Sequence, residues 1–259
     1  MNIWMRRIVA VLPWLGIAAV SCTTVLLVLA PAAWITPRIA KATQGHINLI
    51  DPRGSLWSGS ATLMLAAGAD ASGATVLPGR VEWQTAFWPL LAGRLRVSVR
   101  QTDAMPRPTT LDATFGGATL SASDIALPAA LLSGLGAPFN TLDLKGSVRV
   151  AWTQWHLIRT NLYGRFDVTL SDMVSRVSQV KPLGSYRVVL QAQGAASTLD
   201  LSTLKGPLLL SGHGTIAGGG TSFHGEASSA PEARDNLGGL LNLLGRPTGA
   251  GTVALDYMR

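Results

Sequence analysis

The residue types that most often perform chemistry form no known catalytic or metal-binding pattern in this chain. The four histidines are His46, His156, His213 and His224, and no two of them have the spacing of a His-Glu-x-x-His zinc helix. His213 and His224 flank the glycine turn at 218–220 and can face each other across a hairpin, but the sequence offers no third ligand. We therefore interpret the histidines as surface or core residues and predict no metal site.

Nucleophile and phosphate-binding motifs are also missing. No serine has the Gly-x-Ser-x-Gly spacing of a nucleophile elbow. The run Gly212-His213-Gly214 joins strand-like segments, whereas a P-loop or dinucleotide fingerprint opens a helix. The 14 acidic residues form no Asp-x-Asp or Glu-x-x-Glu pair, and the single cysteine, Cys22, excludes a disulfide within one chain. We predict no catalytic, cofactor-binding or metal-binding residue, and we expect that the protein is not an enzyme.

Composition narrows the possible partners. The 259 residues are 47% hydrophobic and 14% charged, well below the roughly one quarter charged of an average soluble domain. The net charge of +7 is scattered, with no run of lysine or arginine longer than two residues. Phosphate backbones are recognised by clustered basic residues, so we expect no nucleic-acid partner.

A long apolar segment near the N-terminus predicts a membrane anchor. From Ile8 to Thr36 the chain has 29 residues without a charge, against about 20 needed to span a bilayer. Arg6 and Arg7 precede this run, which places residues 1–7 in the cytoplasm and 38–259 in the bacterial periplasm. The alternative is a cleaved signal peptide, whose apolar region is normally shorter, about 7–15 residues. We expect residues 1–37 to be a short cytoplasmic N-terminus and a single-pass inner-membrane anchor.

Beyond residue 37 apolar and polar residues alternate, which is typical of strands with one buried and one solvated face. The alternation is clearest in 94–100, 142–152 and 165–170. Further strands are expected at 60–66, 80–86, 110–115, 186–192, 199–204, 207–211, 221–227 and 251–257. Turn residues recur every 8 to 15 positions, which favours an antiparallel meander over βαβ units. The predicted fold class is therefore mainly β, a transmembrane helix followed by a curved antiparallel β-meander.

Two leucine-rich segments, 128–135 and 231–244, are predicted to be short helices. The octet Leu131–Pro138 shares five of eight residues with Leu240–Pro247, which indicates a possible internal duplication with repeats 45–138 and 139–257. Two short helices can shield only part of the apolar face of such a sheet. We therefore expect a strongly curved or two-layer β-domain, with partner contacts on edges and loops and no deep apolar groove.

The chain resembles the type II secretion system protein N (general secretion pathway protein N) family. The resemblance rests on short motifs spread over residues 45–257: Gly54-Ser55-Leu56-Trp57-Ser58-Gly59, Trp83, Trp88-Pro89-Leu90-Leu91-Ala92-Gly93-Arg94, Gly184-Ser185-Tyr186, Leu204-Lys205-Gly206-Pro207-Leu208, Phe223-His224-Gly225 and Leu243-Leu244-Gly245. It implies an inner-membrane protein with a periplasmic β-rich domain that assists export of folded proteins across the outer membrane. Its partners would be other secretion subunits, on the inner-membrane platform or on the secretin side. No catalytic residues are established for this family, so the resemblance implies none in this chain.

Each of these motifs also has a structural interpretation. Gly54 and Gly59 suit a tight bend into the first strand, where Trp57 seals the sheet edge. Pro89 and Gly93 suit a break between two strands. We interpret these residues as required for folding and not for contact with a partner. A second functional hypothesis remains open, a periplasmic β-sheet module that binds lipid or another hydrophobic ligand on its apolar face.

Overall fold

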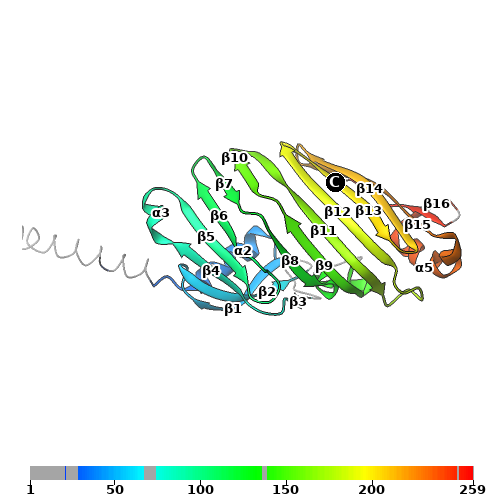
Figure 1. The fold of residues 1–259 in the computed structure, drawn as a ribbon, viewed down its shortest axis with the longest axis horizontal. Coiled ribbons are helices and arrows are strands. Elements are labelled where there is room, and N and C mark those ends of the chain that lie inside the picture. Colours follow the sequence, from blue (N-terminus) through cyan, green and yellow to red (C-terminus); the bar gives the residue numbers. More distant parts are fainter. Residues whose placement is uncertain (1–20, 22–28, 67–73, 136–138, 250, 259) are drawn as a thin grey trace, which may run out of the picture.

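The computed structural model describes residues 21, 29–66, 74–135, 139–249 and 251–258, which form one large antiparallel sheet with short helices (Figure 1). The strands are β1 (Ile47–Gly54), β2 (Ser58–Leu65), β3 (Thr75–Val76), β4 (Val81–Ala86), β5 (Leu95–Gln101), β6 (Thr109–Thr114), β7 (Gly117–Leu120), β8 (Ser123–Pro128), β9 (Leu144–Trp152), β10 (Trp155–Ile158), β11 (Asn161–Ser175), β12 (Gly184–Gly194), β13 (Ala196–Lys205), β14 (Leu208–Ala217), β15 (Gly220–Ser229), β16 (Arg246–Gly249), β17 (Thr252–Ala254) and β18 (Tyr257–Met258). The helices are η1 (Ala32–Trp34), α2 (Thr36–Ala42), α3 (Phe87–Leu91), η2 (Ala129–Leu135), α4 (Phe139–Leu142), η3 (Pro231–Ala233) and α5 (Arg234–Leu244).

The strands lie in the sheet almost in their order along the chain, as the colours of Figure 1 show. β1, β2, β4, β5, β6 and β7 pair in succession, and β11 to β15 do the same. The two series join in the middle, where β7 pairs with β10 and β8 with β9, while β10 and β9 both pair with β11. All these pairings are antiparallel, so the predicted meander is confirmed.

The register separates apolar and charged side chains onto opposite faces. One row of paired residues on the first face consists of Val150, Val168, Val188 and Leu201. We call this face the apolar face; it also carries Ala61, Trp83, Val97, Val99, Leu111, Leu120, Trp155, Phe166, Leu190, Leu199 and Phe223. The opposite face, here the charged face, is crossed by ion pairs between neighbouring strands: Glu82–Arg100, Arg96–Asp112, Asp124–Arg149, Asp167–Arg187 and Asp200–His213.

Asp167 on the charged face gives the sheet a pH-dependent contribution to stability. Arg187 Nε donates to Asp167 Oδ1 at 2.9 Å, and these hydrogen bonds hold the pKa of Asp167 below its usual value although partial burial raises it. A carboxylate with a lowered pKa stabilises the fold above its unfolded-state pKa of about 3.9 and loses this contribution as pH falls through the folded-state pKa. Asp167→Asn is expected to lower the free energy of unfolding at pH 7 by about 1 kcal/mol or less, because the pair is partly solvated. Urea titrations of both proteins in detergent should show this difference shrinking at pH 3; an undiminished difference would contradict the assignment.

The apolar face is covered at its two ends. At the C-terminal end, Leu237, Leu240 and Leu241 of α5 are buried in a core with Tyr186 and Leu208. At the N-terminal end, a smaller core joins Ala32, Ala61 and Trp83. Tyr186 is fixed in the larger core by its hydroxyl, which donates to the carbonyl of Leu208 at 3.1 Å, and burial raises the pKa of this phenol.

The apolar face is less covered along one row at the hairpin ends of the strands. Leu95, Leu157 and Leu162 lie in this row, which the register continues through β6 and β7, and they are 37–38% exposed. The sequence predicted a strongly curved or two-layer β-domain; the described residues form a single sheet, and short helices, among them η2 and α4 beside β9, pack on its apolar face.

The helical predictions need correction in three places. Residues 231–244 form η3 and α5 as predicted, but the helix expected at 128–135 is a 3-10 helix that begins only at Ala129, since Pro128 ends β8. The strand expected at 142–152 begins at Leu144, because residues 139–142 form α4. The helices α2 and α3 were not expected from the sequence pattern. The internal duplication stays a prediction.

The predicted membrane segment 8–36 lies mostly outside the described residues. Its described end does not continue as an apolar helix: Pro31 forms a β-bridge with Ser55, and Ala32 is buried against the sheet in η1. Residues 30–34 therefore pack on the folded domain, and the membrane anchor stays a prediction. Within the part of the chain that the structure describes, no helix has the length and hydropathy needed to cross a membrane.

Candidate functional site

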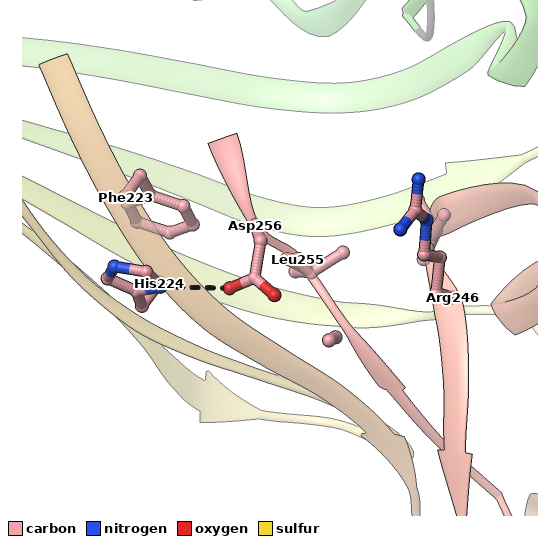
Figure 2. Close-up of a pocket in the computed structure, with 8 residues that line it drawn as sticks. Phe223, His224, Arg246, Leu255 and Asp256 are labelled. Carbon is pink, nitrogen blue, oxygen red and sulfur yellow. Dashed lines mark hydrogen bonds and ion pairs between the residues drawn. The ribbon is translucent and has the colours of Figure 1, made fainter. Parts of the chain in front are cut away.

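A pocket lies at the C-terminal end of the sheet, where the strand pairing changes (Figure 2). Its volume is about 590 Å³, and its lining comes from β15, the end of α5, β16 and the segment that joins β17 to β18: Phe223, His224, Leu244, Gly245, Arg246, Ala254, Leu255 and Asp256. In Figure 2, Phe223 and His224 lie on one side and Arg246 on the other, with Leu255 and Asp256 between them. The walls therefore combine apolar surface with one imidazole, one carboxylate and one guanidinium group.

Two histidine–aspartate pairs stand side by side on the charged face near this pocket. His213 and His224 are direct partners across β14 and β15, so the predicted pairing across the hairpin is confirmed. His213 Nδ1 lies 2.7 Å from Asp200 Oδ1, and His224 Nδ1 lies 3.0 Å from Asp256 Oδ1. These four side chains are 56–62% exposed. Each pair is thus a solvated ion pair when its histidine is protonated, and such pairs contribute little to stability.

The remaining histidines do not join this group. His46 is an exposed residue whose ring contacts the carbonyl of Thr43 at 2.9 Å, and His156 lies on β10 far along the sheet. In the described ranges, no three histidine, cysteine, aspartate or glutamate side chains are grouped closely enough to hold a metal ion.

The strand edge beside the pocket has unpaired backbone. Leu255 and Gly225 exchange two hydrogen bonds, at 2.8 and 3.1 Å, so Leu255 faces β15 with both of its backbone groups. Because such groups alternate along an antiparallel strand, the N–H and C=O of Asp256 point away from β15. The short outer strand β16 pairs only as far as Ala254. Among the described residues, Asp256 therefore has no backbone partner on its outer side, and Asp256 also lines the pocket.

Arg246 completes the pocket as a cation without a counter-charge. It is exposed, and it forms no ion pair with another residue in the described part of the chain. A guanidinium group with free donors fits a carboxylate or another planar acceptor. An extended peptide that pairs with the Asp256 edge could place an acidic side chain against Arg246.

Sequence reasoning alone could not identify this site. The motif Phe223-His224-Gly225 and the segment Leu243-Leu244-Gly245 were recognised, but their proximity depends on the pairing of β15 with β17 and β18. The glycine directly after α5, Gly245, is the one local sequence feature that marks this close approach. A Cβ at this position would lie 2.1 Å from the carbonyl oxygen of Ala254, so glycine is required.

The chain is a single elongated antiparallel sheet with unpaired backbone groups at the strand edge of Asp256. These two features define its structural class. A comparison with protein-family models then identifies the family. The model for the type II secretion system (T2SS), protein N, matches residues 46–256. The chain therefore belongs to this family and is a component of the type II secretion system, as the motifs in its sequence predicted. The searches of curated proteins and of solved structures found no match.

Proposed function

We propose that this chain is a non-enzymatic, membrane-anchored subunit of the type II secretion system that presents its sheet to other subunits in the periplasm. The family match supports the secretion role, and the open strand edge beside Arg246 is the observation that carries the mode of action. Unpaired strand edges bind extended segments of other chains through main-chain hydrogen bonds. In this proposal the protein assists export of folded proteins across the outer membrane by holding other subunits in position.

The proposed topology places residues 1–7 in the cytoplasm, a span from residue 8 to about 29 in the inner membrane, and the sheet in the periplasm. The shortened span still contains 22 uncharged residues, enough to cross a bilayer. A reporter enzyme that is active only outside the cytoplasm is expected to be active when fused after Arg259. An inactive fusion would contradict this topology. Mass spectrometry that finds a mature N-terminus near Ala33 would replace the anchor with a cleaved signal peptide.

The proposed contact predicts a specific effect at Asp256. Proline has no N–H and blocks strand addition, yet it is tolerated where the N–H points away from the sheet. Asp256→Pro is therefore expected to reduce crosslinking between the full-length chain and other secretion subunits in cell membranes by at least about tenfold. Thermal unfolding should stay within a few degrees of the wild type.

The matched control is Asp256→Asn, which removes the charge that faces His224 but keeps the backbone donor. It is expected to crosslink at nearly the wild-type level. Equal crosslinking by the proline and wild-type proteins would exclude this edge as the contact.

A second candidate function is the binding of lipid or another hydrophobic ligand on the apolar face. The observation that favours it is the partly exposed row at the hairpin ends of that face, where Leu95, Leu157 and Leu162 lie on neighbouring strands. Large apolar surfaces that face solvent usually bind something. Native mass spectrometry of the full-length chain, released from detergent, would support this function if one lipid remains bound per chain after exhaustive exchange.

A further inference from the structure

Four large apolar side chains gather at one corner of the sheet and point into solvent. Phe87, Trp88 and Leu91 of α3 are 48%, 79% and 72% exposed, and Phe115 in the turn between β6 and β7 is fully exposed. We call these four residues the aromatic tip. The interpretation of Trp88 as a residue needed only for folding does not agree with this exposure.

Ring contacts and close packing fix three of these side chains on the hairpin ends. The rings of Phe87 and Trp88 meet edge to face with centroids 5.9 Å apart, and Phe87 meets Trp57 in the same way at 5.6 Å. Phe115 lies against Gly93 at the end of α3, where an added Cβ would be 3.1 Å from the ring. The tip is therefore a cluster of exposed apolar side chains on the hairpin ends that project at the α3 side of Figure 1.

The aromatic tip lies at the corner of the sheet where the chain leaves the proposed membrane span. The N–H of Leu56 donates to the carbonyl of Ala30 at 2.9 Å, and Pro31 bridges to Ser55. Trp57, the next residue along, contacts the tip through Phe87. Leu29 itself is 69% exposed. Ala30, near the start of the described chain, is thus linked to the aromatic tip through Leu56, Trp57 and Phe87.

The charges around the tip suit an anionic surface. Arg94 follows α3, and Arg159 lies in the next turn, where its N–H donates to the carbonyl of Gly116 beside Phe115. Both are exposed, and neither pairs with an acidic residue in the described part of the chain. Asp112, which lines a small pocket together with Arg94, is paired with Arg96 at 2.7 Å.

We propose that the aromatic tip inserts into the headgroup region of the bilayer that the N-terminal segment enters, with Arg94 and Arg159 on anionic lipid phosphates. Tryptophan and phenylalanine are favoured at this depth, and nearby arginines strengthen binding to an anionic surface. A bilayer fits better than a protein partner because the tip exposes side chains at the ends of hairpins, close to the residues at which the chain turns toward the proposed span. The inference rests on the proposed anchor for its location, and its effect is to fix the sheet at a defined angle to the membrane.

The test measures how deeply single positions enter the bilayer. Full-length protein carrying Cys22→Ser and either Leu91→Cys or Phe115→Cys is labelled with an environment-sensitive fluorophore and reconstituted into vesicles of phosphatidylethanolamine and phosphatidylglycerol with brominated acyl chains. The matched control is Leu243→Cys, an exposed leucine on α5 at the opposite end of the sheet. Labels at 91 and 115 are expected to be quenched several-fold more strongly than the label at 243.

Three results would count against the proposal or separate it from the topology. Quenching at 91 and 115 no stronger than at 243 overturns it. The proposal is also overturned if the labels at 91 and 115 are not quenched in lipid vesicles but are shielded from solvent in cell membranes. That result indicates a protein partner instead. Carbonate extraction of the same vesicles tests the anchor separately, because it removes proteins that do not span the bilayer. If carbonate extracts the chain although labels at 91 and 115 were strongly quenched beforehand, the result supports the tip and rejects the span.

Discussion

Val148→Asp is expected to lower the free energy of unfolding by about 3–5 kcal/mol, because it places an unpaired carboxylate in the core of the apolar face. Val148 is only 3% exposed and pairs with Leu170 on β11. No described cation lies on the apolar face to compensate the charge, since the arginines of these strands are on the opposite face. Chemical denaturation of the full-length chain in detergent, followed by tryptophan fluorescence, measures the change.

The neighbouring residue supplies the control. Ser147 is exposed on the charged face of the same strand, so Ser147→Asp should change stability by less than about 0.5 kcal/mol. Similar losses at both positions would show that the register of β9 is wrong.

The second large effect is expected in α5. Leu237 is fully buried in the larger core, and Leu237→Ala should destabilise the domain by about 2–5 kcal/mol through lost apolar contact and the remaining cavity. Leu243→Ala, on the same helix but 59% exposed, should cost less than about 0.5 kcal/mol. The same denaturation experiment gives both values. An equal, small loss at the two positions would mean that α5 does not pack on the sheet as described.

The sequence predicted most strands because alternation of apolar and polar residues directly reports a sheet with two different faces. It did not predict β1, which contains Asp51 and Pro52 at a bulge, because these residues are typical of turns. The strands β7 and β10 were missed for a different reason: each has only 4 residues, too few to show a period.

The candidate site and the aromatic tip depend on information that is not local in the sequence. Leu255 meets Gly225 only through the pairing of β15 with the last strands, and Phe115 reaches Gly93 across a hairpin. The exposure of Trp88 could not be predicted, since tryptophan in an apolar motif is more often buried. The family motifs indicated which residues to examine, and the structure shows that some of them face solvent.

The most direct test of the account is a secretion assay in cells that lack this chain. We predict that folded substrate proteins accumulate in the periplasm of the deletion strain. The full-length chain and Asp256→Asn should restore secretion to the medium, and Asp256→Pro should fail to do so at equal abundance. Normal secretion without the chain, or full rescue by Asp256→Pro, would contradict the claim that the protein acts in secretion through its open strand edge.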